Sequence, residues 1–167
     1  EGVIVHNEQA RATIHSVVDG APTALIRRGV PPVTKEVDQA AARERLGLPE
    51  HTFVVLSLGY VTPRKRIRQA LEAFAGLVHK VPNAQYVLAG RVIPDFDVTG
   101  LVQQLGLTDR VLLTGWVEEE DFYAYLAAAD VCVNLRYPVE GETSSVALRM
   151  MSYAKPVLVS DAGSMAE

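Results

Sequence analysis

Three consecutive cations stand where an apolar run ends and an amphipathic stretch begins. Arg64, Lys65 and Arg66 follow Gly59, which ends the apolar run, and Pro63. Positive side chains at a helix N-terminus oppose the helix dipole, so their presence there needs a reason. An anion held between free backbone N–H groups and these side chains is one reason, and a solvated basic turn is the alternative. The residue types and spacing therefore offer a candidate phosphate site.

Carboxylates and hydroxyls gather in a second segment, where Glu140 and Glu142 flank a glycine. Such groups suit the hydroxyls of a carbohydrate, and N–H groups at the start of a following helix suit its phosphates. Arg149 lies seven residues beyond Glu142, which on one helix would put both on nearly the same face, roughly 10 Å apart. A capped helix with an exposed ion pair is the alternative. The hydroxyl residues that open the predicted helix are Thr143, Ser144 and Ser145.

Other kinds of site find no support in the sequence. There is no P-loop pattern and no GxGxxG, so neither an NTPase nor a dinucleotide site is indicated. Glu140 and Glu142 are too close in sequence to straddle a scissile bond as a hydrolase pair does. The histidines have no ligand spacing, so we expect no metal, and we expect no cofactor. They are His6, His15, His51 and His79.

Predicted strands and helices, which would position these groups, alternate regularly from residue 53 onward. Continuous apolar runs predict strands that are covered on both faces, and apolar residues at steps of three and four predict helices. Such alternation indicates an α/β fold, a doubly wound, Rossmann-like parallel sheet whose ligands lie beyond the carboxyl ends of its strands. The predicted strands cover residues 53–59, 84–90, 110–117, 131–135 and 156–161, and the predicted helices cover residues 37–47, 66–81, 98–107, 118–129 and 143–154.

Two further side chains follow a glycine directly at predicted strand ends. Trp116 follows Gly115, and Arg91 follows Gly90. Trp116 is placed to edge a base pocket, but packing on a neighbouring loop is the simpler interpretation. Arg91 is placed to reach a phosphate or a base, but we interpret it as a surface arginine.

Composition is that of an ordinary globular protein. The 167 residues are 49% hydrophobic and 22% charged, which excludes disorder, collagen and coiled coil. No apolar run is long enough to span a membrane, the first residues do not resemble a signal peptide, and Cys132 has no partner for a disulfide. We therefore expect a cytoplasmic protein. The net charge of -4 argues against nucleic acid as a partner.

The first part of the chain differs from the rest. Residues 2–7 predict a strand, residues 8–18 a helix, and residues 23–32 a strand that runs into a stiff turn at a Pro-Pro pair. We interpret residues 1–33 as the tail of a preceding domain with its linker. Residues 34–167 then form one domain, which we expect to be truncated because GSMAE at its end looks like the start of another helix.

Taken in order, these segments resemble the donor-binding half of the family 4 (group 1) glycosyltransferases, which have the GT-B fold. The likeness covers nearly the whole chain. VIVHN followed by IRRGVPP resembles the end of that family's N-terminal domain. Later segments with counterparts in the family include ERLGLP, VVLSLGYVTPRKRI, YVLAG, LGLTDRVLLTGWV and AKPVLVSDAGSMAE.

The resemblance implies transfer of a sugar, of the hexosyl type, from a nucleotide-diphosphate donor to an unknown acceptor, with retained anomeric configuration. It also implies that an N-terminal acceptor domain is missing, so the chain alone should be inactive. Any association with a membrane surface would belong to that missing half. A non-catalytic nucleotide-sugar-binding module and a purely structural partner domain are the competing interpretations.

The resemblance also assigns roles to residues on the phosphate side. Gly59 and Lys65 match the family's donor-diphosphate motif, but Tyr60 stands where the family has an arginine. Arg64 or Arg66 would compensate for that loss. The helix start at residues 143–145 would face the same diphosphate, and with Lys65 it would stabilise the leaving group.

On the sugar side, the family has two glutamates eight residues apart. Glu142, with Glu140 beside it, takes the place of the first, near the donor sugar, and we count it with Lys65 as catalytic. Arg149 stands where the second glutamate would contact the ribose. Backbone groups near Val117 correspond to those that contact the base in the family.

Overall fold

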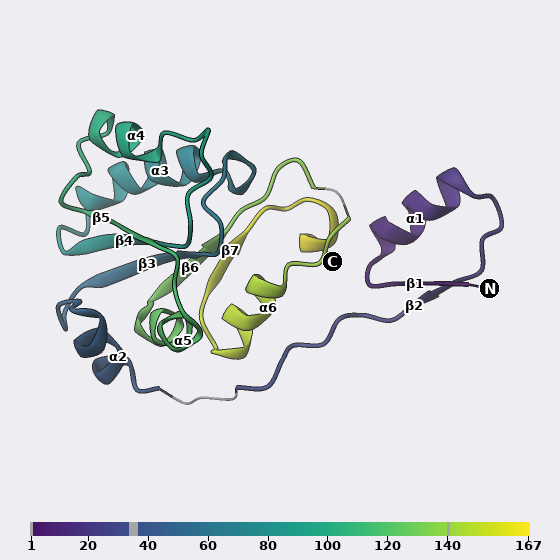
Figure 1. The fold of residues 1–167 in the computed structure, drawn as a ribbon, viewed down its shortest axis with the longest axis horizontal. Coiled ribbons are helices and arrows are strands. Elements are labelled where there is room, and N and C mark those ends of the chain that lie inside the picture. Colours follow the sequence, from purple (N-terminus) through teal and green to yellow (C-terminus); the bar gives the residue numbers. More distant parts are fainter. Residues whose placement is uncertain (1, 34–36, 140) are drawn as a thin grey trace.

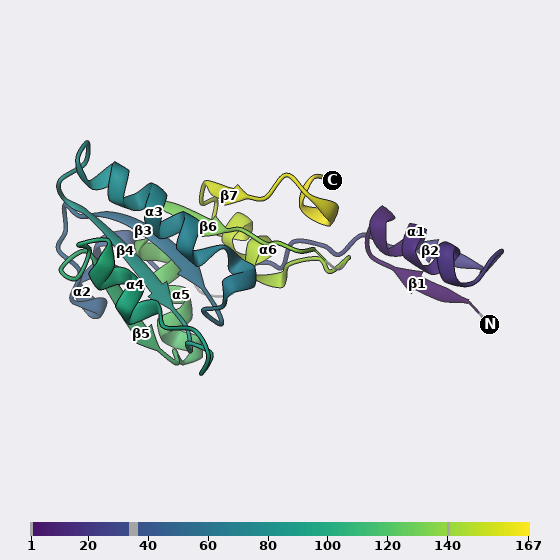
Figure 2. The same ribbon diagram turned by 90° about the horizontal axis from the view of Figure 1, so that it is seen from above.

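The computed structural model describes residues 2–33, 37–139 and 141–167. It has two parts, a small N-terminal unit and a larger α/β domain, and residues 26–33 run from the first toward the second (Figure 1). Seen from above, the N-terminal unit lies at one end of the molecule, beyond α6 and the carboxyl end of the chain (Figure 2). The predicted boundary between residues 33 and 34 stays a prediction, because residues 34–36 lie outside the described residues.

The larger part holds a five-stranded parallel sheet in the order β5-β4-β3-β6-β7. This confirms the predicted α/β fold with a doubly wound sheet. The strands are β3 (Phe53–Leu58), β4 (Ala84–Ala89), β5 (Val111–Gly115), β6 (Val131–Asn134) and β7 (Val157–Val159). The helices are α2 (Gln39–Leu46), α3 (Ile67–Val78), α4 (Val98–Gln104), α5 (Glu119–Ala128) and α6 (Ser145–Ser152), with 3-10 turns at Pro63–Lys65 and Gly163–Met165.

Helices cover both faces of this sheet and bury two apolar cores. In β3, Val54, Leu56 and Leu58 pack toward α2, α5 and α6, whereas Val55 packs toward α3 and α4. Figure 1 shows α3 and α4 above the sheet and α2, α5 and α6 below it. Because β3 is buried on both sides, its sequence is a continuous apolar run and not an alternating one.

Side-chain caps mark the starts of α2, α4 and α6. Asp38 accepts a hydrogen bond from Ala41 N at the start of α2, and Asp97 does the same for Gly100 N at α4. Ser144 Oγ accepts one from Ala147 N, so α6 begins at Ser145 and not at residue 143. Glu142 therefore precedes the helix, and the helical spacing expected between it and Arg149 was wrong.

A partly buried ion pair ties α2 to the sheet. Arg43 Nη2 lies 2.8 Å from Asp130 Oδ2, and the same oxygen accepts a hydrogen bond from Val54 N at 2.7 Å. Arg43 also donates to Ala128 O at the end of α5. These bonds lie at the amino end of β3 and leave its carboxyl end open for other groups.

The N-terminal unit is a strand–helix–strand motif, as predicted. β1 (Val3–Val5) pairs in parallel with β2 (Thr23–Leu25), and α1 (Glu8–Val17) connects them. Its contact with the larger part is made at the start of α1. The carboxylate of Glu167 accepts hydrogen bonds from Glu8 N and Gln9 N and pairs with Arg27.

None of the helices in residues 2–33, 37–139 and 141–167 has the length and apolar character needed to cross a membrane.

The buried face of β3 predicts a large effect of truncation. Leu56 is fully buried, so we expect Leu56→Ala to lower the free energy of unfolding by about 2–5 kcal/mol. Leu158→Ala is the matched control, because that side chain is 57% exposed, and it should cost about 1 kcal/mol or less. Urea denaturation measures both. Equal losses in the two variants would contradict the described core.

Candidate functional site

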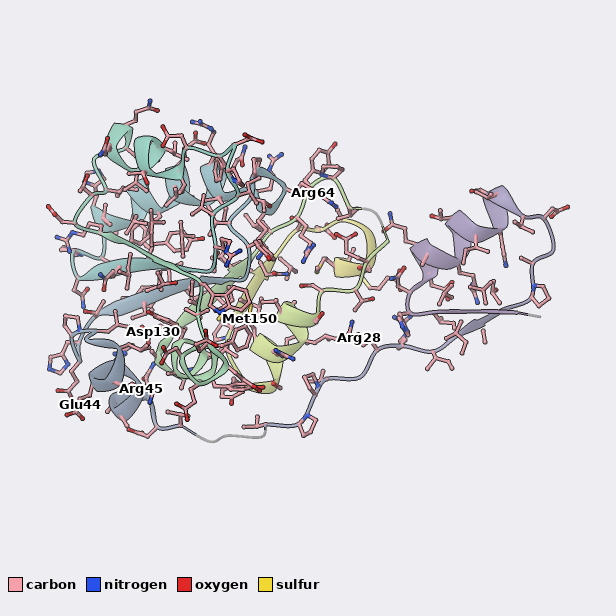
Figure 3. All side chains as sticks on the ribbon, viewed as in Figure 1. Arg28, Glu44, Arg45, Arg64, Asp130 and Met150 are labelled. Atoms are coloured by element: carbon pink, nitrogen blue, oxygen red, sulfur yellow. The ribbon has the colours of Figure 1, made fainter. Side chains whose placement is uncertain are left out.

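The carboxyl ends of β3 and β6 meet at the point where the chain order of the sheet reverses. From β3 the chain builds outward to β4 and β5, then returns to place β6 on the other side of β3. Ligands of open α/β sheets bind in the crevice at such a switch point. Tyr137 N donates to Arg64 O at 2.8 Å, so the two predicted segments lie side by side here. Figure 3 shows Arg64 beside the segment that follows β6.

Lys65 occupies the centre of this edge. Its ammonium Nζ donates to Leu58 O at 2.6 Å, at the last residue of β3. Burial, and then the positive charge of Arg136, lower the pKa of Lys65 from 10.5 to about 8. A Cβ atom on Gly59 would lie 3.1 Å from Nζ, and Gly59 has a φ of 81°. Glycine suits this position because it has no Cβ to crowd the ammonium and because it adopts a positive φ without strain.

Glu142 faces the same place from the other segment. Its Oε1 lies 3.0 Å from Arg136 Nη1 and 3.5 Å from Arg64 Nη2. Its backbone O accepts a hydrogen bond from Ser164 Oγ at 2.5 Å, which fixes the loop. The structure thus brings Arg64, Lys65 and Glu142 to one edge of the sheet, with Arg136 between them.

The three hydroxyl residues have different surroundings. Ser144 is buried, and its Oγ accepts hydrogen bonds from Ala147 N and from Asn134 Nδ2, so it is a helix cap. Thr143 Oγ1 accepts from Asn7 Nδ2 at 3.2 Å, which links the loop to the N-terminal unit. Ser145, the first residue of α6, is exposed. Of the three, Ser145 is best placed to meet a ligand at the helix start.

A cleft of about 180 Å³ continues the edge toward β4 and β5. Two exposed aromatic side chains line it, Tyr60 at 53% and Trp116 at 59% exposure, and Val117 lies among them. A Cβ on Gly90 would lie 2.3 Å from Gly59 O, so the glycine lets the ends of β3 and β4 approach closely. The cleft and the cations share Gly59 and therefore form one continuous surface.

Two further predicted site residues, Arg149 and Arg66, stack on aromatic rings. The guanidinium of Arg149 stacks over the ring of Phe122, which lines the cleft, at 5.4 Å. Arg66 stacks over Tyr137 at 5.4 Å and adopts a left-handed conformation with a φ of 54°. Glu140 lies outside the described residues.

Sequence reasoning did not single out Arg136, although it follows the carboxyl end of a predicted strand, where ligands of this fold bind. Trp116 packs on Arg91 of the neighbouring loop at 5.6 Å, and Arg91 is exposed, as we interpreted them. Both side chains also line the cleft, which is the other position considered for Trp116.

Two other observations limit the site. An apolar groove of about 340 Å³ lies against the face of the sheet, between α3 and β6, away from the edge. Among the residues that the structure describes, no group of three or more His, Cys, Asp or Glu is arranged to hold a metal ion.

Comparison with known sequences identifies relatives of the chain. The family model described as "Glycosyl transferases group 1" matches residues 38–167. An alpha-D-kanosaminyltransferase from Streptomyces kanamyceticus is 30% identical over 127 residues, which are 75% of this chain and 32% of that protein. A 2-deoxystreptamine glucosyltransferase from the same organism is 26% identical over 152 residues, 90% of this chain and 38% of that protein. The chain thus spans about a third of the length of these relatives.

Solved structures share the fold. Sucrose-phosphate synthase from Thermosynechococcus elongatus superposes with a TM-score of 0.76 at 31% identity, covering 97% of this chain and 41% of that one. HepE from Anabaena, solved in complex with UDP and glucose, gives a TM-score of 0.83 at 24% identity, covering 99% of this chain and 46% of that one.

The buried position of Lys65 predicts an unusual titration. With the ε-amines of lysine labelled by nitrogen-15, we expect the Lys65 signal to titrate near pH 8, and Lys65→Met assigns that signal. Because the pKa is lower in the folded chain than in the unfolded one, the wild type should gain stability relative to Lys65→Met as pH rises from 8 toward 10.5. Titration near 10.5 would show that the ammonium is solvated.

Proposed function

Because the chain belongs to the group 1 glycosyl transferases, we propose that it is the donor-binding part of a retaining, family 4 enzyme that transfers a sugar from a nucleotide diphosphate. Its α/β sheet matches the GT-B architecture of glycosyltransferases of known structure. Since the chain spans about a third of its relatives, we propose that a separate N-terminal domain binds the acceptor and that residues 1–33 are the tail of that domain.

The single observation that carries this proposal is that Lys65 and Glu142 share one edge of the sheet. Arg64 and Arg136 both contact the Glu142 carboxylate, and Arg136 is close enough to Lys65 to lower its pKa. Cations beside a carboxylate at a switch point suit a ligand that is anionic at one end and rich in hydroxyls at the other.

The strand order supports a direction for the donor along this edge. The base lies in the cleft beside β4 and β5, near the backbone of Val117. The diphosphate lies over Gly59 and Lys65 at the end of β3, and the sugar lies toward Glu142 beyond β6. A complex of HepE with UDP and glucose shows that a protein of this fold binds such a ligand.

Transfer then depends on stabilising the leaving group. The bond between the sugar's anomeric carbon and a diphosphate oxygen breaks, and negative charge grows on the nucleoside diphosphate. Lys65, Arg64, Arg66 and the N–H groups at Thr143–Ser145 stabilise that charge electrostatically. The acceptor oxygen bonds to the anomeric carbon, and its proton passes to the departing diphosphate oxygen. Glu142 orients the sugar hydroxyls and favours the positive charge that develops on the ring, with Glu140 beside it in the sequence.

Arg149 replaces a carboxylate that would otherwise bind the ribose. In the structure its guanidinium lies on Phe122, one of the residues of the cleft. We therefore place Arg149 at the rim of the base and ribose site, where a guanidinium is able to donate to ribose oxygens.

A non-catalytic nucleotide-sugar-binding module is the second candidate. Tyr60 and Arg149 favour it, because each stands where the resemblance leads us to expect a donor-binding side chain of another type. Product formation by a protein that carries both halves separates the two candidates, since the module would bind the donor without consuming it.

Donor binding is tested by calorimetry of the chain with UDP, GDP and ADP. We expect saturable binding of at least one of the three. Lys65→Met should lower that affinity by about tenfold, because the variant removes a cation that donates a hydrogen bond to the diphosphate. Lys80→Met, an exposed lysine at the end of α3, is the matched control and should bind like the wild type. If none of the three binds, or if both variants bind as the wild type does, the donor site is not at Lys65.

Glu142 is tested by separating transfer from nucleotide binding. In a protein with both halves, Glu142→Ala should lower kcat by about a hundredfold or more, because the sugar loses its orienting carboxylate. Affinity for the free nucleoside diphosphate should fall much less than kcat, because losing a carboxylate that repels the phosphates offsets the lost contact with Arg136. Glu72→Ala, an exposed glutamate on α3, is the control. Equal losses of transfer and of nucleotide affinity would remove Glu142 from the sugar side.

A further inference from the structure

Arg136 is the cation of the switch point that neither the motif nor the resemblance identifies. It follows the carboxyl end of β6 by two residues, and β6 pairs directly with β3 through Leu56 and Cys132. Its side chain therefore starts from the strand next to the one that carries Gly59 and Lys65. Arg136 therefore approaches Lys65 from a different strand than the cations that precede α3, and it shares the Glu142 carboxylate with Arg64.

The backbone around Arg136 is held at several points. Arg136 N donates to Ser160 Oγ at 2.9 Å, and the next residue, Tyr137, donates its N–H to Arg64 O at 2.8 Å. The side chain is 24% exposed, and Nη1 lies 3.0 Å from Glu142 Oε1. The guanidinium is thus positioned before any ligand arrives, which lowers the entropy lost on binding.

One donor of this guanidinium is unsatisfied. Nε of Arg136 is buried, and within residues 2–33, 37–139 and 141–167 no group accepts a hydrogen bond from it. Buried donors without an acceptor are uncommon in folded proteins and call for a structural or functional reason. A phosphate would meet the exposed part of the guanidinium first, and a small shift of the side chain toward it would give the enclosed Nε an acceptor.

Arg136 and Lys65 also repel one another. The positive charge of Arg136 contributes to lowering the pKa of Lys65, so the two cations share a partly buried space. Two like charges at one place are unfavourable unless an anion lies between them. A diphosphate carries enough negative charge to meet both.

The neighbouring arginines are less well placed for this role. The side chain of Arg64 is 47% exposed and reaches Glu142 at 3.5 Å, and Arg66 stacks on Tyr137. Tyr60 lines the cleft and brings no positive charge.

We infer that Arg136 binds the donor diphosphate together with Lys65, in place of the arginine that Tyr60 replaces, and that Glu142 orients its guanidinium. The inference rests on the proposed function and adds to it a residue from the strand on the other side of the switch point. Arg136 is thereby the residue that makes the site selective for diphosphates over monophosphates.

The experiment measures affinity by calorimetry for whichever of UDP, GDP and ADP binds the chain most tightly, and for its monophosphate. We expect Arg136→Gln to weaken diphosphate binding by about tenfold or more and monophosphate binding by less than about threefold. Arg136→Lys keeps the charge but not the planar set of donors, so its diphosphate affinity should lie between those of the wild type and Arg136→Gln. Arg68→Gln removes the same charge from an exposed site on α3 and should change neither affinity.

A pH series distinguishes direct binding from a structural role. Wild-type diphosphate binding should weaken above pH 8 as Lys65 loses its proton, and in Arg136→Gln the midpoint should move to higher pH, because a neighbouring cation is gone. The other charged groups near Lys65 are Arg64 and Glu142. The wild type and Arg136→Gln both keep them, so the shift of the midpoint reports on Arg136 alone.

The outcomes are separable. If the wild type binds none of the diphosphates, the proposed function fails and the inference fails with it. If the wild type binds and Arg136→Gln binds equally well, or loses monophosphate and diphosphate affinity alike, the inference alone is overturned. Should Arg136→Gln fail to fold, Arg136→Lys decides, because undiminished diphosphate affinity in that variant would also overturn it.

Discussion

The hydrogen bond from the Lys65 ammonium to Leu58 O is the interaction on which the candidate site depends. It holds a positive charge at the end of the central strand, and burial opposes that charge strongly enough to lower the pKa to about 8. The glycine at position 59 is required because a Cβ would crowd the ammonium. A cation kept in this way is costly for the free protein and favourable once an anion arrives, which is a property of binding sites more than of structural ones.

Sheet topology orders the other groups around that charge. Because β4 and β5 lie on one side of β3 and β6 on the other, the aromatic cleft and the arginine–glutamate cluster fall on opposite sides of Lys65. The close contact of Gly90 with Gly59 lets the cleft run into the crevice. This order agrees with the direction proposed for the donor, with its base in the cleft, its diphosphate at Lys65 and its sugar toward Glu142.

The sequence predicted the strands and helices because burial imposes a recognisable pattern of apolar residues on each of them. The continuous run of β3 and the spaced apolar residues of α3 both came out as expected. Placement of Glu142 on a helix was wrong, since Ser144 is a better cap than Glu142 and delays the helix. Arg136 follows a predicted strand end but was not singled out, because what distinguishes it from other arginines is its neighbour from another strand, Lys65, and local patterns carry no information on such pairs.

Between the two parts of the molecule, the contact is made by directional bonds and not by a broad apolar surface. The Glu167 carboxylate receives the first N–H groups of α1, and Asn7, which is 3% exposed, donates to Gly141 O. The hydrogen bonds from Glu8 N and Gln9 N, with the charge of Arg27, lower the pKa of Glu167. The contact between the two parts therefore holds at neutral pH and weakens on acidification. Since Asn7 donates hydrogen bonds to the loop that carries Glu142, any displacement of the N-terminal unit would be transmitted directly to that loop.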